Sequence, residues 1–595
     1  MIPKTLRSTG ITTKSIYSKG WIRSKSAVAV STPPNTLYTT TPIFYVNANP
    51  HLGHLYSMLL CDTRNRWEKL NPRAKTFFTT GTDEHGLKIQ TVAEKQNISP
   101  KDLTDKVSQN FKVLATDLDI DYDRFIRTTD QDHVKAVQFF WELMQEKGYL
   151  YEGSHSGWYS VSDETFYPET QIEPIEGNPG KMRSKETKSE VVYQQESNYF
   201  FKLSAFQDRL IEYLETNPDF IIPKTKYTQL LNELKEGPIG DLSVSRPSSR
   251  LTWGIPVPND PSQRIYVWFD ALINYITSCG FPNSFIRDKE TGLFKSGNAW
   301  PATHVIGKDI IRFHCIYWPI FLMAAGIELP EKVVVHSHWL SDGFKMSKSL
   351  GNVVDPQATA AYYGQDSLRF FLMEYSNIES DCNYREDQFH FTRETIIGKF
   401  ANLITRCGGS AFNIEKSVEY AKSGKYEQID ELIGKYSIKT DIEEVKLARD
   451  KLEMTANSLY STMNSHIVQF DQSKAIGEWW SLVERANELF QTAQPWLYTK
   501  ALKDVDLNAE DREALLTLQL YYTYLAAESS RIACILINPI MPKLSTMLLD
   551  RLNVDPTRRN ADFAAIGSDL SYGHGANEKT HKIPIVRIPM RETNL

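Results

Sequence analysis

The sequence predicts an α/β protein built on a doubly wound parallel sheet, with an inserted domain and a helical carboxyl-terminal region. Three observations predict this class. Strand-like and helix-like patterns alternate from about residue 36 to 150 and resume at about 259. Aromatic and polar residues mix between 151 and 258, and helical periodicity dominates beyond about 392. Ligands of such sheets bind at the carboxyl ends of the strands, so function is expected there.

Two β-branched runs, residues 36–46 and 75–80, predict the first strands of the sheet. A helical pattern that includes Leu55, Met58 and Leu59 separates them. The later elements are predicted by periodicity in the same way: 98–118 as a helix, 265–275, 304–306 and 332–336 as the second half of the sheet region, and 452–463, 476–490 and 515–536 as helices.

The composition is that of a globular protein and excludes several classes. Of 595 residues, 41% are hydrophobic and 24% are charged. The most apolar run, 315–327, is too short to span a bilayer and predicts a buried strand or helix, so no membrane insertion is expected. The net charge of -6 means that any contact with nucleic acid requires local basic patches. Six cysteines without C-x-x-C spacing argue against a disulfide framework or a cysteine zinc site.

The amino-terminal segment has a different charge from the rest of the chain. It carries no Asp or Glu before residue 62, and the first thirty residues contain Lys4, Arg7, Lys14, Lys19, Arg23 and Lys25 among Ser and Thr. This composition is typical of a mitochondrial presequence over residues 1–32. The alternative is a disordered basic tail of a cytosolic protein.

The sharpest local motif is HLGH at 51–54, between a predicted strand and a predicted helix. Two imidazoles at a helix start, with Gly53 allowing close approach, are suited to donate hydrogen bonds to a phosphate. A metal pair is the alternative interpretation, but no third ligand is evident nearby in the sequence.

A second motif, KMSKS at 345–349, lies between Gly343 and Gly351. Its lysines and serines are suited to bind a triphosphate and to stabilise a departing pyrophosphate. Alone, such a loop is as often a solvated turn. No Walker P-loop or complete G-x-G-x-x-G motif occurs, which disfavours a kinase, a P-loop ATPase and a dinucleotide dehydrogenase.

Together the two motifs resemble the signature sequences of class I aminoacyl-tRNA synthetases, in that family's order. Surrounding segments narrow the resemblance to the methionyl-tRNA synthetases of the mitochondrial type, over roughly residues 39–552. These segments are TPIFYVN at 41–47, GTDEHG at 81–86, VWFDA at 267–271, IGKDI at 306–310 and PW at 495–496.

The resemblance implies a Rossmann-like catalytic sheet with an inserted connective domain, followed by an α-helical anticodon-binding bundle. The implied domains are 36–150 and 259–340 for the two catalytic halves, 151–258 for the connective domain, 341–391 for the catalytic loop and stem-contact region, 392–558 for the bundle and 559–595 for a tail without an assigned role.

The resemblance also implies an enzyme, a methionine–tRNA ligase of the mitochondrial matrix. It would activate methionine with ATP and Mg²⁺ to methionyl adenylate and then transfer methionine to the terminal ribose of tRNA(Met). The implied transition-state donors are His51, His54, Lys345 and Lys348, and Gly53 and Ser347 join them as ATP-binding residues. Neither step needs a protein nucleophile, so these groups act by positioning and electrostatics.

Nine positions match the family's methionine site, and eight of them, all except Asp83, form an apolar and aromatic set that suits a thioether. They are Ile43, Tyr45, Asp83, Trp268, Ala271, Leu272, Tyr275, Ile310 and His314. In the family, the position of Asp83 binds the substrate ammonium, and Arg246 matches a residue near the carboxylate and phosphate. For Trp268, Tyr275 and Ile310, simple core packing is the alternative.

Asn402, Arg406 and Trp496 match the family's anticodon-binding positions. They offer an aromatic face for an unpaired base, and an amide and a guanidinium for base edges. Trp496 follows Pro495 and is equally suited to a core position at a helix start.

Two departures from the family pattern lead to expected absences. Ser160 stands where zinc-bearing relatives have a cysteine, so no bound zinc is expected. Little chain follows the helical region, so a monomer is expected.

Four alternatives remain at this level. An isoleucine, leucine or valine enzyme would carry a larger insertion, a cysteine enzyme would be expected to use zinc, and a small nucleotidyltransferase would leave the helical region unexplained. An RNA-binding scaffold that has lost catalysis is the alternative from another functional class.

Overall fold

The computed structural model describes residues 36–160, 165–167, 169–175, 177–178, 180–185, 187–296, 299–346, 352–438, 441–580 and 585–592. The predicted presequence at 1–32 and the loop residues Ser347, Lys348 and Ser349 lie outside the described residues.

A six-stranded parallel sheet forms the centre of the amino-terminal region, in the order β3-β2-β1-β16-β17-β9. This arrangement confirms the predicted fold class. The strands are β1 (Leu37–Tyr45), β2 (Thr76–Asp83), β3 (Arg124–Arg127), β9 (Ile221–Ile222), β16 (Ala302–Gly307) and β17 (Lys332–His336).

The strand order reverses beside β1, because the chain leaves β1 for β2 on one side while β16 pairs with its other side. Such a switch point opens a crevice at the carboxyl ends of the two strands. The segments after β1 and β16 therefore meet at one edge of the sheet, and these segments carry the HLGH and GKDI sequences.

Helices pack on the two faces of this sheet and enclose its core. Helix α1 follows β1 and buries its apolar stripe, including Leu55, Met58 and Leu59. Helix α3 begins at a Ser99 cap followed by Pro100, which is a favourable helix start. The helices of this part are α1 (Leu52–Lys69), α2 (Leu87–Gln96), α3 (Pro100–Asp117) and α4 (Gln131–Glu146).

The segment between the two halves of the sheet is mainly antiparallel β structure, built around the long pair β4 and β8. Two helices follow, and the short strand β9 between them returns to the edge of the central sheet. The elements are β4 (Leu150–Ser160), β5 (Thr165–Tyr167), β6 (Ile172–Pro174), β7 (Met182–Ser184), β8 (Glu190–Phe201), α5 (Gln207–Thr216), α6 (Lys224–Glu236), β10 (Leu242–Ser243), β11 (Ser245–Pro247), β12 (Pro256–Val257) and β13 (Asp260–Ile265).

Short helices line the second half of the sheet region. The apolar run at 315–327 lies in a π-helix and the buried helix that follows it, so it is a buried helical segment. The elements are α7 (Val267–Leu272), α8 (Asn274–Thr277), β14 (Phe285–Arg287), β15 (Phe294–Ser296), η3 (Lys308–Ile310), η4 (Phe313–Tyr317) and α9 (Trp318–Ala325).

A small three-stranded sheet and three helices connect the six-stranded sheet to the helical region. They are β18 (Trp339–Ser341), β19 (Phe344–Lys345), β20 (Cys382–Tyr384), α10 (Pro356–Tyr363), α11 (Gln365–Glu374) and α12 (Glu386–Thr395).

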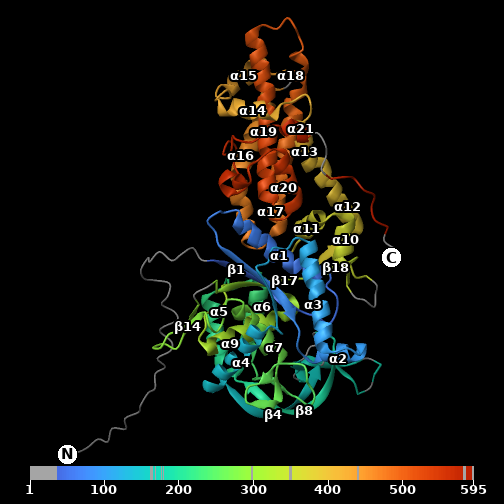
Figure 1. The fold of residues 1–595 in the computed structure, drawn as a ribbon, viewed down its shortest axis with the longest axis vertical. Helices are drawn as coiled ribbons and strands as arrows, with labels where there is room; N and C mark the ends of the chain where they lie inside the picture. Colours follow the sequence, from blue (N-terminus) through green and yellow to red (C-terminus); the bar gives the residue numbers. More distant parts are fainter. Residues whose placement is uncertain are drawn as a thin grey trace, which may run out of the picture. The chain divides into compact units, whose positions relative to one another are not determined.

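The carboxyl-terminal region is helical, and α16, α17 and α19 pack together along it (Figure 1). Helix α19 is almost wholly buried. The helices are η6 (Ile396–Ala401), α13 (Asn402–Cys407), α14 (Ile414–Lys422), α15 (Ile429–Tyr436), α16 (Ile442–Ile467), α17 (Gln472–Ala493), α18 (Pro495–Ala501), α19 (Ala509–Ile537), α20 (Pro542–Arg551) and α21 (Ala576–Thr580).

The predicted tail packs back on the molecule at two places. Arg531 and Glu528, a fully buried pair on α19, bind the tail backbone near Ala565 and Gly567. Residues 585–592 lie against α10 and α12, where Arg591 pairs with Glu386 at 3.1 Å. The tail therefore stabilises the helical region and the α10–α12 segment.

Candidate active site

The two histidines of the HLGH motif cap the start of α1, and backbone N–H groups of the motif hold both rings. The backbone N–H of Gly53 donates to Nδ1 of His51 at 3.0 Å, and the backbone N–H of His51 donates to Nδ1 of His54 at 3.1 Å. The ring centroids lie 3.8 Å apart. Phe44 and Phe111 pack edge-on against His54 at 5.1 and 5.2 Å. Both rings are thus oriented before any substrate is present.

These hydrogen bonds assign the tautomer of each ring. In a neutral imidazole one nitrogen accepts and the other donates, and here both Nδ1 atoms accept. The donor of each ring is therefore its Nε2–H. Burial, reinforced by the neighbouring His51, holds the pKa of His54 well below its usual range. His54 is neutral at physiological pH and serves as a hydrogen-bond donor without carrying charge.

Gly53 is required by the close approach of the first histidine ring. A Cβ at this position would lie 2.9 Å from Cε1 of His51 and 3.1 Å from its Nδ1. Any side chain would displace the ring and break the cap. The glycine of the motif therefore preserves the orientation of the histidine before it.

Most residues of the predicted methionine set come together around Trp268 and Tyr275. Ile43 and Tyr45 lie two apart on β1 and share a face of the strand. Trp268, Ala271, Leu272 and Tyr275 recur with helical spacing over α7 and α8. The Trp268 ring lies 6.3 Å from both Tyr45 and His314.

His314 and Tyr275 form a buried polar pair inside this apolar cluster. Nδ1 of His314 lies 3.0 Å from the Ile310 carbonyl, so it donates there and leaves Nε2 as an acceptor. The hydroxyl of Tyr275 donates to that Nε2 at 2.6 Å. Burial lowers the pKa of His314 to about 4. The π-helix η4, which begins at Phe313, brings His314 under Ile310; such helices recur at functional sites.

Asp83 ends β2 directly beside Tyr45, its register partner at the end of β1. The carboxylate is buried, with 2% of the residue exposed. Burial raises the pKa of Tyr275, and the charge of Asp83 adds to that shift. A buried anion at this edge of the sheet is suited to receive an ammonium group.

The next residue fixes the end of β2. Glu84 is fully buried and accepts from Nε and Nη2 of Arg127 at 2.6 and 2.8 Å. Hydroxyls of Thr82 and Thr129 donate to the same carboxylate. This satisfied network stabilises the backbone that presents Asp83.

A buried His–Asp–His cluster supports the same site, and the sequence did not reveal it. Asp270 accepts from Nδ1 of His85 and from Nε2 of His133, each at 2.7 Å. Burial alone would raise the pKa of Asp270, but the two histidines outweigh it and hold that pKa below its usual range. The cluster connects α7, which carries Trp268, to the loop after Asp83 and to α4. His85 lies within the GTDEHG segment and Asp270 within the VWFDA segment, whereas no motif in the sequence singles out His133.

Lys345 lies on β19, at the start of the KMSKS loop, and its side chain is exposed. Burial alone would raise the pKa of Asp309, but a hydrogen bond from His338 and the charges of His338, Lys345 and Lys308 outweigh it and lower that pKa. Asp309 is the second residue after β16, at the same sheet edge as the histidine pair.

Arg246 lies on β11, away from the cluster around Trp268 in the pattern of its contacts. Its Nη1 donates to the Ser245 carbonyl at 2.7 Å and to the Ser243 hydroxyl at 3.0 Å. Its guanidinium lies 4.6 and 5.2 Å from the ring centroids of Tyr266 and Tyr159. The described contacts thus assign it a packing role, and a contact with substrate stays a prediction.

The predicted anticodon residues share one side of the helical region. Asn402 and Arg406 lie one turn apart on α13. The Arg406 guanidinium lies 5.1 Å from the Phe490 ring and donates to Asn487 on α17 at 3.3 Å. Trp496, at the start of α18, is half-buried with its ring 6.2 Å from the same Phe490. Phe490 is therefore the shared support of Arg406 and Trp496.

Comparisons with known proteins agree with this arrangement. The family described as tRNA synthetases class I (M) matches residues 37–408. The chain belongs to this family. Among its relatives, a mitochondrial methionine–tRNA ligase of Candida albicans is 56% identical over 93% of this chain and 96% of the relative. The corresponding human protein is 40% identical over 88% of this chain and 85% of its own length. A methionyl-tRNA synthetase of Mycobacterium tuberculosis in complex with methionyl-adenylate covers 91% of this chain and 97% of its own, with a TM-score of 0.76 and 35% identity.

As a methionyl-tRNA synthetase of the mitochondrial type, the chain is an enzyme, a methionine–tRNA ligase, with ATP, methionine and tRNA as its substrates. The expected fold, activity and family are confirmed. The roles of individual residues stay predictions, since their support here is geometric.

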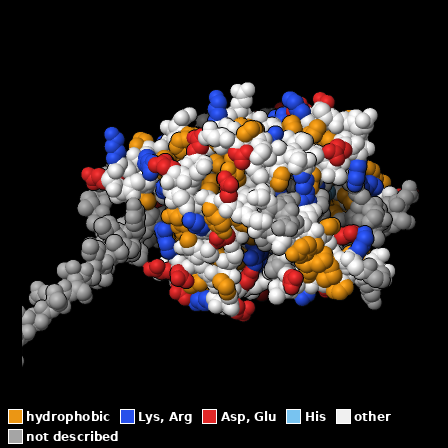
Figure 2. Space-filling model, turned by 90° about the horizontal axis from the view of Figure 1, so that it is seen from below, with side chains coloured by type: hydrophobic (Ala, Val, Ile, Leu, Met, Phe, Trp, Pro, Cys, Tyr) orange, Lys and Arg blue, Asp and Glu red, His pale blue; other side chains and the backbone are white. Residues whose placement is uncertain are grey.

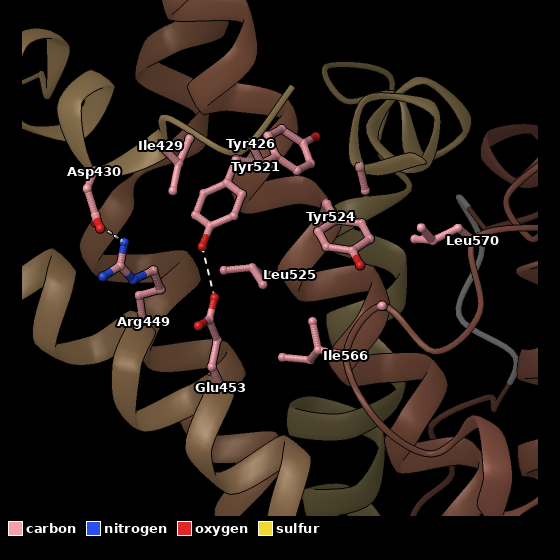
Figure 3. Close-up of a pocket in the computed structure, with 12 residues that line it drawn as sticks. Tyr426, Ile429, Asp430, Arg449, Glu453, Tyr521, Tyr524, Leu525, Ile566 and Leu570 are labelled. Carbon is pink, nitrogen blue, oxygen red and sulfur yellow. Dashed lines mark hydrogen bonds and ion pairs between the residues drawn. The ribbon is translucent and has the colours of Figure 1, made fainter. Parts of the chain in front are cut away.

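The cavity of about 440 Å³ in the synthetase's helical region is separate from the site described above (Figure 3). It lies between α15, α16 and α19, and its polar groups pair with one another. The Tyr521 hydroxyl donates to Glu453 at 2.9 Å, and Arg449 pairs with Asp430. Because these groups are satisfied, we assign the cavity no ligand.

One face of the molecule carries charges of both signs, and the described residues form neither a cluster of metal ligands nor a helix able to span a membrane. On the face seen in Figure 2, acidic and basic side chains are interspersed rather than separated. Among the described residues, no three His, Cys, Asp or Glu side chains gather as a metal site requires. No described helix has the length and apolarity needed to cross a bilayer.

Proposed function

We propose that the chain charges tRNA(Met) with methionine in the mitochondrial matrix, through the histidine pair at the start of α1, the KMSKS loop and the pocket around Trp268 and Tyr275. The observation that carries the proposal is the double cap of α1. It leaves the two Nε2–H groups as donors at a helix start, beside the crevice where β1 and β16 separate.

In the activation step, the methionine carboxylate attacks the α-phosphate of ATP. The bond from that phosphorus to the bridging oxygen breaks, and pyrophosphate leaves. The Nε2–H donors of His51 and His54 stabilise charge that develops on the phosphate oxygens. Mg²⁺ enters with ATP as part of the substrate and offsets the charge of the triphosphate. Lys345, with Ser347 and Lys348, binds the departing pyrophosphate.

Methionine is held by chemistry that suits both ends of the molecule. Asp83 receives its ammonium group. A contact of Arg246 with its carboxylate is proposed from the family resemblance, since the described contacts of Arg246 are packing contacts. The rings of Tyr45 and Trp268 contact the thioether, and the Tyr275–His314 pair supplies a polar tip. Ile43, Ala271, Leu272 and Ile310 complete the apolar wall.

In the transfer step, the terminal ribose hydroxyl of tRNA attacks the carbonyl carbon of methionyl adenylate, and AMP leaves. Asn402, Arg406 and Trp496 read the anticodon by hydrogen bonding and stacking. The shared contact of Arg406 and Trp496 with Phe490 supports this proposal, as does the place of Asn402 one helical turn from Arg406, because all three side chains are partly exposed.

Two further features of the enzyme are proposed from the sequence. Ser160 is fully buried on β4 where a zinc-bearing relative has cysteine, so the enzyme works without zinc. Elemental analysis of the purified protein should find far less than one zinc per chain; one zinc per chain would contradict this.

The enzyme is proposed to act as a monomer, and sedimentation at micromolar concentration should give the mass of one chain.

The proposed function is tested by amino-acid-dependent exchange of pyrophosphate into ATP, followed by charging. Methionine should support exchange, whereas isoleucine, leucine, valine and cysteine should not at equal concentration. Mitochondrial tRNA(Met) should then accept methionine. Binding of RNA without methionine-dependent exchange would instead indicate a scaffold that has lost catalysis.

A further inference from the structure

Helix α1 carries the histidine pair at one end and contacts the helical region near its other end. It is one uninterrupted helix of 18 residues, about 27 Å long. Near its carboxyl end, Nε1 of Trp67 donates to Oδ1 of Asn464 on α16 at 2.9 Å. The Trp67 ring stacks on Tyr460 with centroids 5.4 Å apart and an interplanar angle of 17°. Trp67 is 1% exposed, so this contact is a buried junction between the two regions.

The same half of α1 is also held by a buried ion pair. Asp62 and Arg369 are both fully buried, with Nη2 of Arg369 2.6 Å from Oδ2 of Asp62. Arg369 also donates to the carbonyls of Pro539 and Ile540, which join α19 to α20, at 2.8 and 2.9 Å. A single guanidinium thus binds the catalytic helix, the connecting helix α11 and the helical region.

The junction and the proposed anticodon face lie at opposite ends of one helical hairpin. Asn464 is three residues before the end of α16, next to the turn into α17. Asn487 and Phe490, which contact Arg406, lie near the far end of α17. Helices α16 and α17 pack along their lengths, so a displacement at one end of the hairpin moves the other.

We propose that the Trp67–Asn464–Tyr460 junction couples tRNA bound at the helical region to the sheet edge at the start of α1, and that these three are positioning residues for the transfer step. The proposal rests on the proposed anticodon face. Without tRNA, the histidines are held by backbone hydrogen bonds at the start of α1, and α1 itself is held by His336, whose Nε2 accepts from Ser57 at 2.8 Å. The junction is therefore expected to affect the transfer step, when bound tRNA displaces the α16–α17 hairpin, and to have little effect on methionine activation.

The test is Asn464→Leu, which removes the acceptor at nearly constant volume, compared with Asn464→Asp, which retains it. For Asn464→Leu, the kcat of charging at saturating tRNA should fall at least about fivefold, the lower range of measured couplings. Pyrophosphate exchange without tRNA and the KM for tRNA should stay within about twofold. Asn464→Asp should restore charging. Tyr521→Phe, which removes one hydroxyl contact between α19 and α16 away from α1, is the matched control and should charge normally.

A second variant changes the junction at Trp67, on helix α1. Trp67→Phe keeps a ring against Tyr460 but removes the donor, so it should reproduce the charging defect, and the double variant should be no worse than either single one. Unchanged charging in both variants would overturn the proposal, as would a parallel loss of exchange, which indicates a general structural role.

Two experimental outcomes distinguish a wrong junction from a wrong anticodon assignment. If Arg406→Ala leaves tRNA binding unchanged while Asn464→Leu still lowers charging, Arg406 does not read the anticodon, and the junction stands with tRNA bound through other residues of the helical region. If Arg406→Ala weakens tRNA binding and Asn464→Leu has no effect, the junction is wrong and the proposed function stands.

Discussion

The sheet region is proposed to bind its substrates through buried side chains, whereas the helical region is proposed to bind tRNA through side chains that are partly exposed. Around the sheet edge, the polar groups are buried, neutral or paired, as in the capped histidines and the Tyr275–His314 bond. On the helical face, Arg406 and Trp496 are half-exposed and are supported by one ring, Phe490. The chemical step gains from fixed dipoles in a dry site, whereas reading a large polyanion requires charge and rings accessible to solvent.

The largest expected effect comes from removing one buried donor. His54→Ala should lower the rate of methionine-dependent pyrophosphate exchange about 100- to 1,000-fold, because a preorganised donor to developing charge is lost. The Kd for methionine should change little. His574→Ala, which removes a histidine far from the sheet edge in the chain, is the control. Exchange at the wild-type rate in His54→Ala would show that the capped pair is not the activation site.

The corresponding change on the helical face should spare activation. Arg406→Ala should weaken tRNA binding about 30-fold, the loss expected when a charged contact to a base edge disappears. Exchange without tRNA should be unaffected. The measurements are the KM for tRNA and the exchange rate of the same preparation. Equal charging of tRNA by the variant and the wild type would show that Arg406 does not contact the anticodon.

The pH dependence of stability should come from the sheet region. Burial lowers the pKa of His336 to about 4, so its neutral form stabilises the fold above about pH 6.5 and that contribution is lost as the pH falls toward 4. Between pH 7.5 and 5, this group should cost about 2 kcal/mol of unfolding free energy. Urea unfolding at both pH values should show a smaller difference in His336→Gln; an identical difference would contradict the assignment.

The smallest effect concerns the polar tip of the methionine pocket. Tyr275→Phe removes the hydroxyl that donates to His314 and should raise the KM for methionine about fivefold, the cost of one buried hydrogen bond. The kcat should change less than about twofold. Tyr227→Phe, which loses a buried hydroxyl contact to the Leu214 carbonyl elsewhere, is the control. A lower kcat at unchanged KM would place Tyr275 in the chemical step instead.

Local patterns in the sequence were sufficient to predict the fold class and the place of the HLGH motif. The β-branched run at 36–46 and the helical spacing of Leu55, Met58 and Leu59 predicted a strand and a helix on either side of it, which are β1 and α1. Apolar residues three and four apart likewise predicted α16, α17 and α19. These features depend on neighbours in the chain, which a single sequence contains.

Contacts between distant segments were not predictable in this way. His133 meets Asp270 across 137 positions, and β9 leaves the inserted segment to pair with β17. The Trp67–Asn464 bond spans 397 positions. Each depends on packing that exists only after the sheet and the bundle have formed, so neither residue type nor spacing signals it.

Methionine activation is proposed to need only the sheet region and the KMSKS loop. The decisive experiment is methionine-dependent pyrophosphate exchange by the unmodified enzyme in the absence of tRNA. Exchange should be full and saturable, and its rate should not rise when tRNA is added. Exchange that is absent until tRNA binds would show that the activation site is incomplete without tRNA.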